Sequence, residues 1–136
     1  MSPDRLSPWM HWLLRFAGGY NIVAGLSMMI FYHEGFKAIG VTKSEFNLPI
    51  QLVGMLVAVF GVGYLIVDRR PLDNHNILAL GFFTKLLGPL MAIAYIAKGV
   101  LPLAMLLVLF VSDFVYLVPF YLIYRRITAT NSAKLS

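Results

Sequence analysis

The chain has 136 residues, of which 60% are hydrophobic and 12% charged, whereas soluble domains average roughly 45–50% apolar and about 25% charged residues. This composition is typical of a membrane protein and leaves little chain for a soluble lobe. The absence of cysteine excludes disulfides and thiolate chemistry, and the net charge of +5 comes from scattered basic residues, so no nucleic-acid partner is expected.

The first apolar segment covers residues 9–32 and contains two polar residues, Arg15 and Asn21. About 20 apolar residues cross the ~30 Å hydrocarbon layer, so this length predicts a transmembrane helix. The segment is too long for a signal peptide, and we expect it to be retained. Gly18, Asn21 and Gly25 form a stripe that favours close helix packing.

Residues 33–47 form the one sizeable segment predicted outside the bilayer, as an extracytoplasmic loop. Phe36, Ile39 and Val41 have the spacing of a short amphipathic turn that rests on the membrane surface. A plain connector is the simpler interpretation of this loop, and a functional lid is the alternative.

The second predicted span, residues 48–67, carries no charge. Asn47 precedes it and is a candidate N-cap, and Gln51 in its first turns is a candidate interhelical hydrogen-bond donor. A second stripe of small residues follows, and it favours close approach of a neighbouring helix: Gly54, Ala58 and Gly61.

The third and fourth predicted spans, residues 76–97 and 100–124, form one apolar stretch that is too long for a single crossing. The stretch therefore folds back at residues 97–102, where Lys98, Gly99 and Pro102 occur together. Asp73 or Asn74 is expected to cap the third helix. Residues 125–136 are expected to form a tail.

Basic residues at the span ends predict the orientation, because cytoplasmic loops carry an excess of Lys and Arg. An even number of spans puts both termini and the 68–71 connection on one side. That side carries six basic residues (Arg5, Arg69, Arg70, Arg125, Arg126 and Lys134), and the other carries Lys37, Lys43 and Lys98. Both termini are therefore expected in the cytoplasm, with Arg15 reaching back toward that surface.

Lys85 is an ionisable residue in the middle of the third span. At about 1.5 Å per residue it lies roughly 13 Å from the cytoplasmic surface, and Asp113 on the fourth span lies roughly 16 Å from it. Because a tight turn joins these two spans, they are expected to be antiparallel neighbours. We therefore predict that Lys85 pairs with Asp113.

Three further polar groups are predicted at the same depth. Asn21 lies about 18 Å from the same surface, Tyr20 is adjacent to it, and Tyr116 is one turn from Asp113. The cluster has two interpretations, which the sequence leaves open. It is either a structural clamp that fixes helix register, or a functional pocket that binds a polar head group or carries a proton.

The three histidines were considered as haem or metal ligands. His11 and His75 lie at the cytoplasmic starts of the first and third spans, and His33 lies at the other side. None is at mid-membrane depth, so ordinary interfacial histidines are the simpler interpretation. No metal site and no resident cofactor are predicted.

Four stretches give the chain a resemblance to a known group: GGYNIVAGL, NLPIQLVG, GVGYLIVDRRP and LGFFTKLLGP. Their hydropathy and glycine placement resemble small four-span bacterial membrane proteins of the DoxX-like type. Some members of that group are linked to quinone-dependent respiratory or sulfur-oxidising complexes. The resemblance implies a bacterial inner-membrane location, and it assigns no role to any single residue here.

The sequence thus predicts an all-α fold, an integral membrane four-helix bundle in one domain. The leading functional hypothesis is a non-enzymatic accessory or binding protein. It would hold a lipid or a quinone-like ligand beside Lys85 and Asp113, or pack against a larger membrane complex or further copies of itself. The alternative is a small intramembrane enzyme or proton-coupled carrier that uses Asp113 and Lys85, with Asp113 as acid or base.

Overall fold

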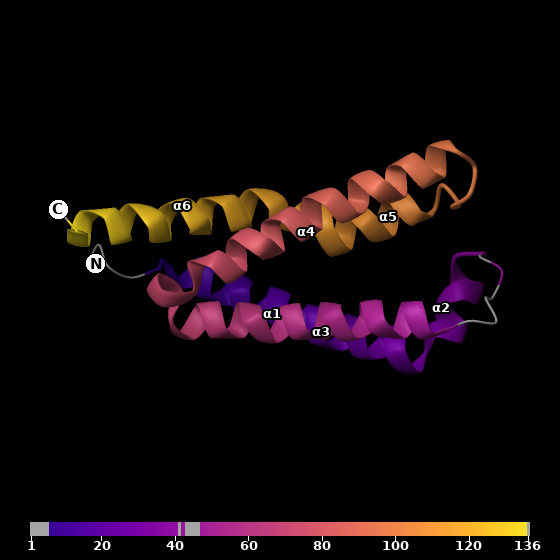
Figure 1. Cartoon of the computed structure of the whole chain (residues 1–136), viewed down its shortest axis with the longest axis horizontal. Coiled ribbons are helices and arrows are strands. Elements are labelled where there is room, and N and C mark those ends of the chain that lie inside the picture. The colour runs from indigo at the N-terminus through magenta and orange to yellow at the C-terminus, as the bar shows by residue number, and fades with distance from the viewer. Residues whose placement is uncertain (1–5, 41, 43–46, 136) are drawn as a thin grey trace.

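The computed structural model describes residues 6–40, 42 and 47–135. All regular elements within these residues are helices, which confirms the predicted all-α class. Four helical segments are long and apolar enough to cross a membrane: α1 (Pro8–Ile30), α3 (Leu48–Arg69), α4 (Pro71–Ala97) and the continuous helix Met105–Lys134. The start of α1 and the end of α6 lie at one end of the bundle (Figure 1), which we call the terminal end.

The fourth helical segment consists of three consecutive elements. A short helix α5 (Met105–Leu109) leads into a π-helix η1 (Phe110–Phe114), and α6 (Val115–Leu135) follows without a break. The helix therefore runs through most of the region expected to be a tail. The apolar part of this sequence ends where the hydrocarbon layer ends, but the helical backbone hydrogen bonds continue past that point. The apolar stretch therefore underestimates the length of this helix.

The turn predicted between the third and fourth spans is present. Helix α4 ends at Ala97, and Gly99 adopts a φ of +72°, a left-handed conformation that glycine reaches without a steric penalty. The amide of Val100 donates to the carbonyl of Tyr95 at 2.9 Å, which closes the turn. This turn lies at the end of the bundle opposite the terminal end (Figure 1), which we call the far end. The predicted loop, also at the far end, begins with a short helix α2 (Tyr32–Ala38). Val41 of that loop lies outside the described residues.

Asn47 occupies the predicted N-cap position of α3, but neither predicted cap makes a side-chain capping bond among the described residues. The Asn47 Oδ1 is buried without a described partner. Helix α4 begins earlier than expected, at Pro71, whose fixed φ suits the first helical position. Asn74 instead lies inside the helix at a non-helical φ of −120°, and its amide donates to the Arg70 carbonyl at 3.0 Å.

Helices α1 and α3 pack closely along their predicted glycine stripes. A Cβ atom added to Gly61 would lie 2.6 Å from the Gly18 carbonyl oxygen, and one added to Gly54 would lie 2.6 Å from the Gly25 oxygen. These distances are too short for any side chain, so the two backbones are in contact. Gln51 adds the predicted interhelical bond, from its Nε2 to the Met29 carbonyl at 3.3 Å.

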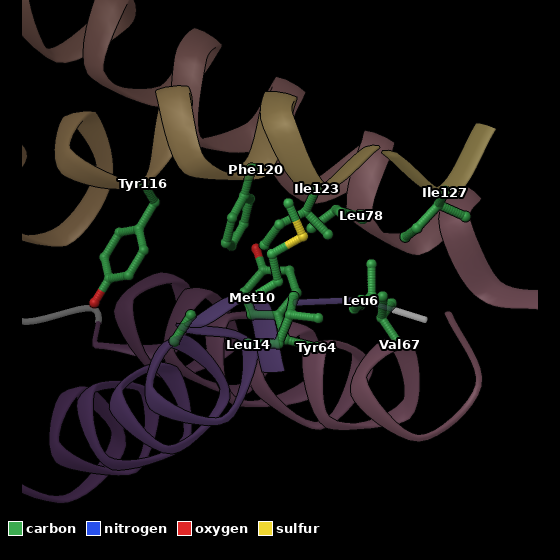
Figure 2. Close-up of a cluster of buried hydrophobic side chains, with 11 residues drawn as sticks. Leu6, Met10, Leu14, Tyr64, Val67, Leu78, Tyr116, Phe120, Ile123 and Ile127 are labelled. Atoms are coloured by element: carbon green, nitrogen blue, oxygen red, sulfur yellow. The ribbon is translucent and has the colours of Figure 1, made fainter. Parts of the chain in front are cut away.

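The buried apolar core occupies the terminal half of the bundle. Its large side chains come from α1, α3, α4, α6 and the residues just before α1, and they meet between the helices (Figure 2): Leu6, Met10, Leu14, Tyr64, Val67, Leu78, Tyr116, Phe120, Ile123 and Ile127. Toward the far end, the α4–α5 hairpin diverges from the α1–α3 pair (Figure 1), and α5 and η1 pack on α4. The core therefore ends near the middle of the membrane-spanning region.

Candidate functional site

The polar cluster predicted around Lys85 lies where this core ends. Lys85 on α4 is 4% exposed, and its Nζ has three oxygen acceptors. It donates to the Ser112 carbonyl at 2.6 Å, to Asp113 Oδ1 at 3.3 Å and to Asn21 Oδ1 at 3.5 Å. The ammonium thus connects α1, α4 and η1, and the predicted Lys85–Asp113 pair forms.

The two predicted tyrosines complete the cluster. The Lys85 Nζ lies 4.7 Å from the centre of the Tyr116 ring, within the range of a cation–π interaction. The Tyr20 ring lies 6.2 Å from the Tyr116 ring at a tilt of 38°, which is an ordinary aromatic contact. The structure therefore brings together all five residues that the sequence placed at this depth: Asn21, Tyr20, Lys85, Asp113 and Tyr116.

Ser112 is a member of the site that the sequence analysis missed. It lies in η1, where π-helical register replaces the usual i to i−4 bonds, and its carbonyl oxygen makes the shortest contact with Lys85. Its hydroxyl has one proton, which is shared between the Val108 carbonyl at 2.7 Å and Asp113 Oδ2 at 2.9 Å. Hydropathy gave no signal for this change of register.

The cluster is closed on one side and open on the other. Asn21 and Tyr116 are 5% and 3% exposed, and the Lys85 side chain is 5% exposed. The Asp113 side chain, in contrast, is 24% exposed. Tyr20, Ser112 and Asp113 are the partly exposed members, so a molecule that approaches from outside the bundle meets these residues before Lys85.

Tyr64 is a second residue that the sequence analysis missed. Its side chain is fully buried, and its hydroxyl packs against Gly81, one turn before Lys85 on α4. This hydroxyl has no described hydrogen-bond partner. A fully buried hydroxyl without a partner is uncommon in proteins, because buried polar groups are nearly always hydrogen-bonded.

A separate charged cluster lies at the terminal end and was also missed. Asp68 at the end of α3 is 7% exposed, and it accepts hydrogen bonds from His11 Nδ1 at 2.6 Å and from Arg15 Nε at 2.8 Å. Arg15 was expected to reach toward the membrane surface at this end, and its guanidinium pairs with this carboxylate there. The signal was available in the sequence, since His11 and Arg15 are one helical turn apart and face one side of α1.

The histidines weighed as haem or metal ligands have other partners. His11 binds Asp68, and the His75 Nδ1 lies 3.2 Å from the Leu72 carbonyl. No group of three or more metal-ligating side chains occurs within the described ranges 6–40, 42 and 47–135.

The chemistry that the Lys85 cluster offers is recognition of a polar group in an apolar setting. It contains an ammonium donor, a carboxylate, an amide and two phenols, and lysine and aspartate can also exchange a proton. A scan of protein-family models, a search of curated proteins and a search of solved structures each found no match to the chain, so its function is inferred from this geometry alone.

Proposed function

We propose that the chain is a small membrane binding protein that holds an apolar molecule with a polar head at the Lys85 cluster. A lipid or a quinone has the required chemistry, with a carbonyl group at one end and a long apolar remainder. The observation that carries this proposal is the position of the cluster, buried at the point where the apolar core ends and the helix pairs diverge (Figure 1).

The distances around Lys85 favour exchange of one acceptor. The ammonium has three protons, and its shortest contact, at 2.6 Å, is to the Ser112 carbonyl. The contact to Asn21 is 3.5 Å long and is the weakest of the three. A ligand carbonyl that replaces Asn21 as acceptor therefore gains a charge-assisted hydrogen bond while Lys85 keeps Ser112 and Asp113.

The surroundings of the cluster match the apolar part of such a ligand. Large side chains beyond the core are exposed on both helix pairs, among them Val23, Leu26, Val59, Leu107 and Phe110. In a bilayer these surfaces face acyl chains or protein partners. A bound lipid, further copies of the chain or a larger membrane complex would cover them, so an accessory role is part of the same proposal.

The location that fits this proposal is the bacterial inner membrane, as the resemblance to DoxX-like proteins implies. The excess of basic residues at the terminal end favours both termini in the cytoplasm. Trp9 and Trp12, which are 46% and 68% exposed, lie at the same end and suit the membrane interface.

Native mass spectrometry of the protein purified in mild detergent tests the proposal. We expect a lipid or quinone to copurify at about one per chain, and to be lost in the double variant Lys85→Met and Asp113→Leu. Gln51→Leu is the matched control, because it removes an intramembrane polar group far from the cluster. Equal ligand content in the wild type and a folded double variant would contradict ligand binding at the Lys85 cluster. Copurification of a larger protein in a stoichiometric amount would favour the accessory role alone.

The alternative of a proton-coupled carrier or enzyme is favoured by one observation, the partial exposure of Asp113 beside the Ser112 hydroxyl. In proteoliposomes with an enclosed pH-sensitive dye and an imposed inward proton gradient, a carrier would acidify the vesicle lumen, and Asp113→Asn would abolish that flux. A binding protein would give no flux in either form, so this measurement separates the two functions.

A further inference from the structure

A second polar site lies at the terminal end of the bundle, away from the Lys85 cluster. A hollow of about 480 Å³ is present where α1, α3 and α4 meet, a volume within the roughly 300–1,000 Å³ range of small-ligand sites. Its lining includes one buried and three exposed charged side chains: Asp68, then Arg69, Arg70 and Asp73. The lining also includes His11, Leu6 and Leu72.

The buried carboxylate already has its partners. Asp68 binds His11 through one oxygen and Arg15 through the other, so it has no strong need for a ligand. The bond to Nδ1 fixes the imidazole of His11 and leaves Nε2 as its remaining polar atom. Asp68 is therefore a positioning residue that holds the His11 side chain at the wall of the hollow.

The exposed charges of the hollow differ from Asp68, because no ion pair joins them to another described side chain. They belong to Arg69, Arg70 and Asp73. Two adjacent guanidinium groups suit a phosphate, which they bind through paired N–H donors. The Asp73 carboxylate, separated from them by only Pro71 and Leu72, suits a cation with N–H donors.

The place of the hollow in the membrane identifies the class of ligand. It lies at the end of the apolar part of α3, near the exposed Trp9 and Trp12, and Leu6 and Leu72 add apolar lining. A phosphate and a primary ammonium a few bonds apart occur in the phosphoethanolamine and phosphoserine head groups, and phosphoserine adds a carboxylate that Asp73 would repel. We propose that the hollow binds a phosphatidylethanolamine-type lipid, with phosphate at Arg69 and Arg70 and ammonium at Asp73.

Nanodiscs test this proposal with three lipids that have the same acyl chains. One has a phosphoethanolamine head group, one a phosphocholine head group and one a phosphoglycerol head group, and retained lipid is counted by native mass spectrometry. We expect about tenfold preference for phosphoethanolamine over phosphocholine, because a quaternary ammonium cannot donate to Asp73. Retention of all three lipids alike, or preference for phosphoglycerol, would overturn the proposal.

Two variants assign the two halves of the site, and both replace exposed side chains that form no ion pair among the residues that the structure describes. Asp73→Asn should remove the preference for phosphoethanolamine over phosphocholine but keep phosphate binding. Arg69→Gln with Arg70→Gln should lower retention of every phospholipid at this site about tenfold or more. The matched control, Arg125→Gln with Arg126→Gln, removes the same charge at the terminal end outside the hollow and should change neither quantity.

Competition with soluble phosphoethanolamine separates head-group recognition from acyl-chain packing. We expect displacement of the lipid at high competitor concentration from the wild type and no such effect of inorganic phosphate alone. If the double Arg variant keeps full lipid retention, the hollow is not the site and the proposal is wrong. This result would leave the Lys85 pocket untouched, since that site is tested by different variants.

Discussion

Lys85 is held by more than the carboxylate with which it was predicted to pair. Its shortest contact is to a backbone carbonyl at 2.6 Å, and the Asp113 oxygen lies farther away at 3.3 Å. An ammonium in a membrane interior is stabilised by the sum of such acceptors rather than by one opposite charge. The carboxylate nevertheless matters most for neutrality, because the carbonyl and the amide carry no net charge.

This reasoning predicts unequal effects of single and double substitutions at the pair. Lys85→Met leaves Asp113 without its counter-charge and should lower the free energy of unfolding by about 3 kcal/mol. Lys85→Met combined with Asp113→Leu removes both charges and should recover most of that loss. Unfolding in mixed micelles, followed by far-UV circular dichroism, measures both values, and a double variant as unstable as the single one would contradict this account.

Asp68 gives a second prediction at the scale of single residues. Asp68→Asn keeps the shape but removes the charge that binds His11 and Arg15, and we expect a loss of about 2 kcal/mol of stability. Asp73→Asn is the matched control. It changes an exposed carboxylate a few residues away and should alter stability in lipid-free detergent by no more than about 0.5 kcal/mol. Similar losses in both variants would mean that the Asp68 bonds add nothing specific.

At the scale of elements, two kinds of helix pairing coexist in the bundle. Helices α1 and α3 approach through glycines along most of their length, whereas α6 meets α1 and α3 through large side chains such as Phe120 and Ile123 (Figure 2). The first pairing depends on the absence of side chains, and the second depends on their volume. Substitutions that add one methyl group should therefore act very differently on the two.

Alanine substitutions of glycine test this difference. In Gly61→Ala the new methyl group would lie 2.6 Å from the Gly18 carbonyl oxygen, so the helices must separate, with an expected loss of about 1–3 kcal/mol. Gly19→Ala and Gly88→Ala are controls, since a Cβ atom there meets no atom within 4 Å, and they should cause no loss. Equal tolerance at all three positions, measured by thermal unfolding in detergent, would rule out tight α1–α3 contact.

The π-helix η1 is the element that arranges the site. Its register turns Ser112 and Asp113 toward α4, so that a carbonyl and a carboxylate from consecutive residues both reach Lys85. A regular α-helix would separate consecutive side chains by about 100° and keep the carbonyl in its own hydrogen-bond ladder. Single-turn π-helical segments are frequent at functional sites, which is consistent with the proposed pocket.

At the scale of the whole molecule, the bundle has two unlike halves. The terminal half has the apolar core and the Asp68 cluster, and the far half consists of two diverging helix pairs (Figure 1). The Lys85 cluster lies between the halves. The protein is thus most firmly packed near one membrane surface, and lipid or partners must cover the rest.

The orientation in the membrane can be tested directly because the chain has no cysteine. We expect Lys98→Cys to react with a membrane-impermeant thiol reagent in intact cells, and Ser132→Cys to react only after permeabilisation. The reason is the excess of basic residues at the terminal end, which favours the cytoplasmic side. The reverse labelling pattern would show that the charge bias does not set the orientation of this protein.

The sequence by itself determined the all-α class, the four membrane-length helices and the meeting of Lys85 with Asp113. Counting residues along a helix gives depth, and the Gly99 turn makes its two helices neighbours, so groups at equal depth meet. Only the tertiary structure decided which side of each helix faces inward. It therefore also decided that the Ser112 carbonyl reaches Lys85, that Tyr64 is buried, and that Asp68 has its two hydrogen-bond partners. These helices are apolar on all sides, as lipid requires, so hydrophobic periodicity does not mark the inner face and cannot detect one turn of π-helix.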